Sequence, residues 1–192
     1  ATAVFSVFFG RMSGSPTDGL PYPVFAMAGV VPWLLFANGV TGGTTSLVAN
    51  EQLVRRVYFP RYLIPLGAVL SGLVDSALSL LLLIGLSLFY GLTPSATWLC
   101  LPFILLLCAI TTTAIAEILA ALNVRFRDVQ HVTPFFTQML LFLSPVVYAV
   151  DVLSEPWRTV YTLNPLVGIV EAMRWALTGA TAPPLVALAL TV

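Results

Sequence analysis

Charged residues carry most of the chemistry that this sequence could perform, and they are unevenly placed. The chain has eight basic side chains, all of them Arg, with eight Asp and Glu residues and one His. The densest group is formed by Glu51, Arg55, Arg56 and Arg61. Because a guanidinium group makes paired hydrogen bonds to carboxylates and phosphates, this segment could hold a phosphate group or face another protein.

Residues for metal binding or nucleophilic catalysis do not form a set. Cys100 and Cys108 lie in one apolar run and His131 is the only histidine, which leaves no zinc ligand set and no Cys–His pair. The sequence has no Lys, so it holds neither a P-loop lysine nor a Schiff-base amine. We therefore expect that the protein is not an enzyme, that it binds no metal or cofactor, and that any ATP is bound by a partner. The net charge is zero, so the sequence does not predict a basic surface that binds nucleic acid.

Two carboxylates stand inside apolar runs. Asp75 and Glu117 would each cost about 2.5 to 3.5 kcal/mol if ionised at the centre of a bilayer. They therefore need water or a charged partner, such as Arg61 for Asp75. A proton relay would make the protein a secondary transporter, but no other titratable residue lies deep in a span. The sequence therefore favours structural pairing, or the lining of a polar vestibule.

The elements that carry these residues are membrane helices. Hydrophobic residues make up 59% of the chain and charged residues 8%, whereas a soluble domain has roughly 25% charged residues. A bilayer core of about 30 Å needs about 20 apolar residues per helix. We expect one all-α membrane domain over residues 1–192, cut at both ends from a six-span protein. Its spans are predicted at 23–48, 63–90, 98–122 and 132–150, with partial spans at 1–9 and 183–192.

The arginines predict which loops face the cytoplasm. Loops 49–62 and 123–131 hold most of them, whereas the longer loops 10–21, 91–98 and 151–182 hold only Arg11, Arg158 and Arg174. Basic residues concentrate in cytoplasmic loops. The first two loops are therefore predicted to be cytoplasmic, and they contain Arg55, Arg56, Arg61, Arg125 and Arg127.

The segment from Asn50 to Phe59 is predicted to be a short amphipathic helix. At 3.6 residues per turn, Leu53 and Tyr58 fall on one side, and Arg55 falls on the other. Pro60 lacks the amide hydrogen that a continuing helix needs. Such a helix lies at a membrane surface, where another protein could push on it. A connector on the membrane surface with no partner fits the pattern equally well.

The external segment before residue 183 is predicted to hold two short helices. Helix-start signals at Ser154–Pro156 and Asn164–Pro165, with a stop at Gly179, place them near 155–162 and 165–178. Fourteen residues span about 21 Å, so the second helix is expected to dip into the membrane and return, or to lie at its interface. Glu171 and Arg174 are three residues apart and could pair, which would lower the cost of insertion. An ordinary surface-lying helical hairpin remains the alternative.

Three long stretches follow one another in the chain. They are PWLLFANGVTGGTTSLVANEQLVRRVYFPRYLIPL, LNVRFRDVQHVTPFFTQMLLFLSPVVYAV and LNPLVGIVEAMRWALTG. Together they resemble the membrane subunit of ABC-2 type exporters of polysaccharides and polyol phosphates, namely the O-antigen, capsule and teichoic-acid permeases. The resemblance covers the chain from Phe5 to Gly179.

This resemblance implies a six-span, type V exporter-like ABC-2 fold in the bacterial cytoplasmic membrane. It implies a homodimer seated on a separate ABC ATP-binding subunit, and a lipid-linked glycan as substrate. Coupling to the ATPase would then involve Glu51, Arg55, Arg56, Tyr58, Phe59 and Arg61, with a second contact at Asn123, Arg125, Arg127 and Asp128. The external gate helices would carry Trp157, Tyr161, Asn164, Pro165, Glu171 and Arg174.

Other functions compete with this interpretation. A drug exporter of the same superfamily is the nearest, followed by a proton-coupled secondary transporter. An enzyme acting on polyprenyl phosphates would need clustered acidic or basic groups, and the cytoplasmic loops offer only Glu51, Asp128 and His131. Glu117 departs from the small or apolar residue that the resemblance leads us to expect at its position.

Overall fold

The computed structural model describes residues 20–56, 58–144, 146 and 164–179. Every regular element in this part is helical, which confirms the prediction of an all-α protein. The elements are α2 (Tyr22–Ala49), α3 (Glu51–Arg56), α4 (Leu63–Phe89), the 3-10 turn η1 (Ala96–Cys100), α5 (Leu101–Arg125), α6 (Val129–Phe142) and α8 (Pro165–Thr178).

Three helices are long and apolar enough to cross a membrane: α2, α4 and α5 together with η1. They occupy the segments where the second, third and fourth of the six spans are predicted. The helix α6 has 14 residues, and most of the rest of the predicted run to residue 150 lies outside the described residues. The partial spans at 1–9 and 183–192, and the short helix near 155–162, also lie outside them.

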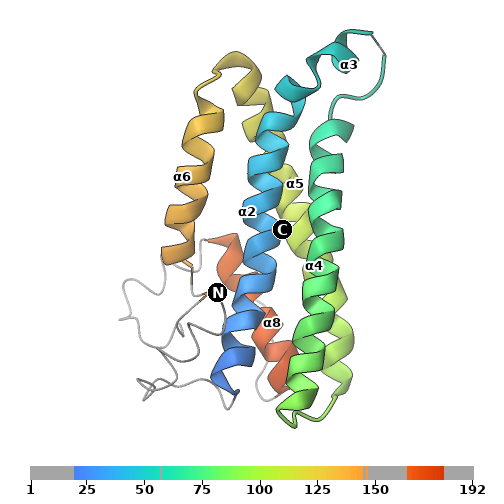
Figure 1. Ribbon diagram of the computed structural model, residues 1–192, viewed down its shortest axis with the longest axis vertical. Helices are drawn as coiled ribbons and strands as arrows, with labels where there is room; N and C mark the ends of the chain where they lie inside the picture. Colours follow the sequence, from blue (N-terminus) through green and yellow to red (C-terminus); the bar gives the residue numbers. More distant parts are fainter. Residues whose placement is uncertain (1–19, 57, 145, 147–163, 180–192) are drawn as a thin grey trace.

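The helices α2, α4, α5 and α6 run up and down, and α2 has the central place (Figure 1). It packs against α4, α5, α6 and α8, and it is the most buried of the three long apolar helices. The helix α3 and the turn between α5 and α6 lie at one end of the bundle, whereas the turn after α4 lies at the other (Figure 1). The two arginine-rich loops thus share one end.

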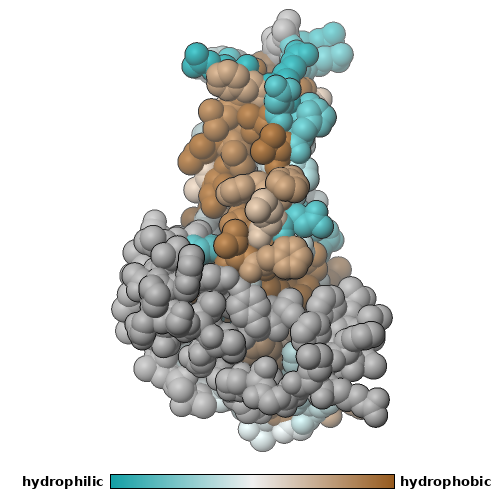
Figure 2. Space-filling model, turned by 90° about the vertical axis from the view of Figure 1, so that its left-hand side faces the viewer, coloured by the Kyte–Doolittle hydropathy of each residue, from teal (hydrophilic) through white to brown (hydrophobic). Residues whose placement is uncertain are grey.

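The outward faces of the helices are apolar along most of their length. On α6 the exposed residues include Phe135, Phe136, Met139 and Phe142. In the view of Figure 2, hydrophobic residues cover much of the coloured upper part of the face, and hydrophilic residues gather at the upper end and down the right-hand side. This distribution is the one that a protein in a bilayer requires, since its lipid-facing surface has no water to satisfy polar groups.

Small residues bring α2 and α5 close together. A Cβ atom built on Gly39 would lie 2.6 Å from Cγ2 of Thr112, and one on Gly43 would lie 2.6 Å from the Cβ of Ala116. No side chain tolerates such distances, so glycine is required for this approach. Glycines four residues apart on one helix face are a common device for close contact between membrane helices, where burial in lipid supplies no hydrophobic force. We call these four residues the α2–α5 seam.

The helix α8 has well-defined ends. The Asn164 side chain accepts a hydrogen bond from the Leu166 amide at 3.1 Å, and Pro165 occupies the first turn. Gly179 follows the helix with φ of 62°, a left-handed conformation that glycine adopts without strain. These are the residues that carry the start and stop signals in the sequence. The helix packs against α2, α5 and η1, and buries almost all of its apolar side chains.

The helix α3 is shorter than predicted. It ends at Arg56, and Tyr58–Pro60 have no regular structure, whereas the amphipathic pattern extends to Phe59. The physical reason is the effect of Pro60 on its neighbour. The proline ring clashes with the backbone of the preceding residue in a helical conformation, so Phe59 is driven to an extended one.

Candidate functional site

The two arginine-rich loops form a single polar end of the bundle. We call this the arginine-bearing end, and define it as α3, the link 58–61 and the turn 125–128. Most of its polar side chains are exposed, and Phe59 is half-buried. The exposed side chains include those of Arg56, Tyr58, Arg61, Arg125, Arg127 and Asp128. The structure therefore brings together the two sets of residues that the sequence assigns to coupling.

The helix α3 is exposed on nearly all sides. Glu51, Arg56 and the apolar Leu53 are exposed, and Tyr58 beyond its end is 106% exposed. Within the described part α3 packs only slightly, mainly against the end of α2. A six-residue helix is too short to be stable from its own hydrogen bonds. The apolar side chain of Leu53 is thus available to a surface outside this bundle.

The turn between α5 and α6 is held by Asn123. Its side-chain amide donates to the Thr44 carbonyl of α2 at 3.0 Å, and its side-chain oxygen accepts from the Gln130 amide at 3.1 Å. Asn123 is fully buried. The resemblance groups it with the contact residues Arg125, Arg127 and Asp128, but its position gives it a different role. Asn123 clamps α2, α5 and α6 together, and so fixes the turn that presents those three exposed residues.

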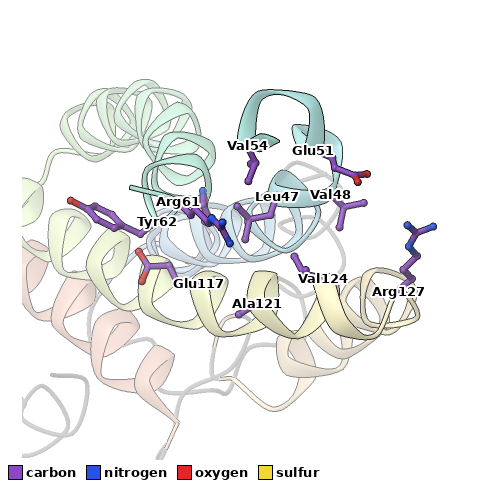
Figure 3. A pocket seen from close by; sticks show the side chains of 11 residues that line it. Leu47, Val48, Glu51, Val54, Arg61, Tyr62, Glu117, Ala121, Val124 and Arg127 are labelled. Atoms are coloured by element: carbon purple, nitrogen blue, oxygen red, sulfur yellow. The ribbon is translucent and has the colours of Figure 1, made fainter. Parts of the chain in front are cut away.

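A pocket opens between the ends of α2, α3, α4 and α5 (Figure 3). Its volume is about 850 Å³. Four of its lining side chains are charged, namely Glu51, Arg61, Glu117 and Arg127. The others are Tyr62 and the apolar residues Leu47, Val48, Val54, Pro65, Ala121 and Val124. The pocket therefore combines an apolar wall with charges of both signs.

The two intramembrane carboxylates have different surroundings. Glu117 is half-buried and lines the pocket together with Arg61. Asp75 is exposed on α4, and its backbone carbonyl accepts a hydrogen bond from Ser79. The pocket thus gives Glu117 a polar environment that the sequence alone could not supply. No group of three or more His, Cys, Asp or Glu residues that could hold a metal occurs among the residues described.

The opposite end of the bundle is held by Arg174 of α8. Its guanidinium carbon lies 3.6 Å from the centroid of the Phe25 ring on α2, and its Nη2 donates to the Val146 carbonyl at 3.0 Å. Arg174 is only 5% exposed. Glu171 is half-buried, and the pairing of Glu171 with Arg174 stays a prediction. Trp157 and Tyr161, the other gate residues from the sequence, lie outside the described residues.

Further hydrogen bonds tie α8 to its surroundings. The Asn164 side chain donates to the Ser144 hydroxyl at 3.0 Å. The Thr97 hydroxyl of η1 donates to the Ala176 carbonyl at 2.7 Å. The helix α8 is therefore fixed to the bundle near both of its ends as well as through Arg174.

A comparison with known protein families decides what kind of bundle this is. The family model of the ABC-2 type transporter matches residues 1–178. The chain belongs to the ABC-2 transporter family. This ABC-2 protein is a multi-pass membrane protein, and the family resemblance noted in the sequence is confirmed.

Characterised ABC-2 relatives include exporters of bacterial polysaccharides. The chain is 30% identical over 154 residues to the O-antigen export system permease protein RfbA of Klebsiella pneumoniae, covering 80% of this chain and 60% of that protein. It is 32% identical over 153 residues to RfbA of Myxococcus xanthus, covering 79% and 59%. It is 24% identical over 169 residues to the polysialic acid transport protein KpsM of Escherichia coli, covering 88% and 66%. The ABC-2 chain thus spans about 60% of the length of the first of these relatives.

The sequence interpretation missed three features of this ABC-2 bundle. The α2–α5 seam could have been found, because Gly39 and Gly43 have the four-residue spacing of a helix-packing motif. The structural role of Asn123 has a weaker signal, since an amide near the end of an apolar run has several possible partners. The stacking of Arg174 on Phe25 has no sequence signal, because it joins two helices at opposite ends of the described chain.

Proposed function

We propose that this chain is the membrane permease part of an ATP-driven ABC exporter, which moves a lipid-linked polysaccharide or polyol phosphate polymer outward across the bacterial cytoplasmic membrane. Family membership and the polysaccharide-exporting relatives support the class of substrate. ATP is hydrolysed by a separate ABC ATP-binding subunit. The observation that carries the coupling is the exposed, weakly packed α3 at the arginine-bearing end.

The shape of this end suits mechanical coupling. Pro60 and the buried Pro65 stiffen the connection between α3 and α4, because proline restricts the backbone. A partner that closes on ATP and displaces α3 would therefore push on α4. The helix α4 packs against both α2 and α5, so a push on α4 would be passed on to these two helices.

We further propose that two copies of the permease form the translocation path. The core around α2 is filled by side chains of α4, α5 and α8, so a polymer has to pass along an outer surface of the described bundle. A second copy supplies the opposite wall of such a path. The helix α8, expected to dip into the membrane from outside, would gate its external end.

The coupling assignment is tested by reversing charge on α3. The double variant Arg55→Glu with Arg56→Glu is expected to lose co-purification with the ATPase and to stop export of the glycan to the cell surface. The matched control is Arg55→Lys with Arg56→Lys, which keeps the charge at the same positions and should retain association. Membrane insertion of both variants should be normal by cell fractionation. Unchanged co-purification of the Glu variant would refute the assignment.

A further inference from the structure

Three charged side chains that line the pocket under α3 are unpaired within the described part of the chain. Arg61, Arg127 and Glu117 make no side-chain hydrogen bond or ion pair with any residue that the structure describes. Figure 3 shows Glu117 and Arg61 on one side of the pocket and Arg127 on the other. The pocket therefore offers two guanidinium groups and one carboxylate to whatever enters it.

These groups are complementary to a ligand that carries both charges. Guanidinium groups bind phosphate oxygens through paired hydrogen bonds. A carboxylate that is half removed from water, as Glu117 is, gains most from a cation that can donate hydrogen bonds to it. A phosphate next to a primary ammonium group satisfies both requirements.

The depth of Glu117 indicates a ligand that reaches into the bilayer. Glu117 precedes the end of α5 at Arg125 by about two turns, or roughly 12 Å. With 25 residues, α5 is about 37 Å long and exceeds the hydrocarbon core, so its last turns extend to the interface. Because α5 exceeds the core by only about 7 Å, Glu117 lies at least about 5 Å inside the hydrocarbon core, even with all of that excess at the Arg125 end.

Apolar surface continues from the pocket toward the lipid. Beside Glu117 and Ala121 on α5, Ile118 and Leu122 are 63% and 42% exposed, and Leu63 on α4 is 43% exposed. Acyl chains attached to a headgroup in the pocket can lie along these residues. A lipid with its headgroup in the pocket can therefore keep its acyl chains in the bilayer, and competition with a soluble phosphoamine distinguishes it from a soluble ligand.

We propose that the pocket binds an aminophospholipid of the phosphatidylethanolamine class as a resident lipid. Its phosphate contacts Arg61, its ammonium group donates to Glu117 on the same side of the pocket, and its acyl chains cover the apolar surface beside α5. The bound lipid fills the space between α3 and the ends of α4 and α5. The proposal does not depend on the identity of the exported polymer.

The experiment is a lipid titration of the purified, delipidated full-length protein, read by native mass spectrometry. The probes are phosphatidylethanolamine, phosphatidylcholine and phosphatidylglycerol with the same acyl chains. The wild type is expected to retain phosphatidylethanolamine about tenfold more than the other two. Glu117→Gln should lower retention of phosphatidylethanolamine about tenfold and leave phosphatidylglycerol unchanged, because only the ammonium contact is weakened. Arg61→Gln should lower retention of all three.

Matched controls lie outside the pocket. Asp75→Asn removes a carboxylate from the exposed face of α4, and Arg125→Gln removes an exposed guanidinium at the same end of the bundle. Both should bind phosphatidylethanolamine as the wild type does, and size-exclusion profiles establish that every variant is folded. Competition with phosphoethanolamine in solution should not displace the lipid. Equal retention by Glu117→Gln and the wild type, a wild-type preference for phosphatidylglycerol, or displacement by phosphoethanolamine would each overturn the proposal.

Discussion

The guanidinium carbon of Arg174 lies 3.6 Å from the centroid of the Phe25 ring, so α8 is attached to the first turn of α2. Both side chains are buried. A cation stacked on an aromatic ring contributes about 2 kcal/mol when the pair is removed from water. The contact is therefore strong enough to hold α8 in one position, and its loss should be measurable.

Weakening this contact should destabilise the protein. Arg174→Lys keeps the charge but loses the planar group, and Phe25→Leu loses the ring. Each is expected to lower the free energy of unfolding by about 1–2 kcal/mol, measured by thermal unfolding in detergent. The double variant should lose less than the sum of the two, since both changes weaken the same stacked pair.

A second buried phenylalanine on α2 provides the control for the Arg174 experiment. Phe36 is another buried phenylalanine on α2, about three turns further along the helix. Phe36→Leu combined with Arg174→Lys should show additive losses, because the two residues share no interaction. Additive losses for Phe25→Leu with Arg174→Lys would contradict the stacking.

Enlarging a glycine of the α2–α5 seam should prevent normal folding. Gly43→Ala places a methyl group 2.6 Å from the Cβ of Ala116, so the two helices have to separate. We expect a severe loss of folded protein on size-exclusion chromatography. The combination with Ala116→Gly removes the clashing atom and should restore the yield.

Other glycines provide the controls for the seam. A methyl group on Gly42 would make an ordinary contact of 3.9 Å with Ala68, and one on Gly67 would meet nothing within 4 Å. Gly42→Ala and Gly67→Ala should therefore fold like the wild type, or slightly better, because alanine favours the helix. A normal yield of folded Gly43→Ala protein would show that α2 and α5 do not pack closely enough at Gly43 to require glycine there.

Removing the Asn123 clamp should loosen the turn between α5 and α6. Asn123→Leu removes the bond to the Thr44 carbonyl and leaves the Gln130 amide without its partner, at a cost of about 1–3 kcal/mol. We expect a lower unfolding temperature and faster proteolysis between residues 125 and 129. Gln130→Ala is the control, because the bond uses the backbone amide and survives the substitution. Equal protease sensitivity of the two variants would count against the clamp.

The orientation of the bundle can be tested with single cysteines. In a background where Cys100 and Cys108 are replaced, Tyr58→Cys should resist a membrane-impermeant thiol reagent in intact cells. Thr93→Cys, in the exposed turn after α4, should react with it. Labelling of Tyr58→Cys from outside the cell would reverse the orientation and remove the basis for coupling to a cytoplasmic ATPase.

Sequence reasoning succeeded where the physical cause is local. Runs of apolar residues determine where long membrane helices form, and Asn164 with Gly179 determines the ends of α8 through their own backbone preferences. The end of α3 is the exception: its cause, the effect of Pro60 on Phe59, is local, but the amphipathic pattern that continues to Phe59 predicted a longer helix.

Contacts between helices were not predictable in the same way. Asn123 and Thr44 are 79 residues apart, and their hydrogen bond depends on the rotation and offset of α5 against α2. Apolar helices of this kind carry little amphipathic pattern to fix that rotation. For the same reason the sequence suggested Arg61 as a partner for Asp75, whereas the structure places Arg61 in a pocket with Glu117.

The central position of α2 has a consequence for synthesis of the protein in the cell. This helix leaves the ribosome before α4, α5, α6 and α8, although those helices provide its packing surfaces. Until α5 arrives, the glycines and threonines of α2 face lipid or the insertion machinery. The half-made chain is therefore more exposed to quality-control proteases than the finished one.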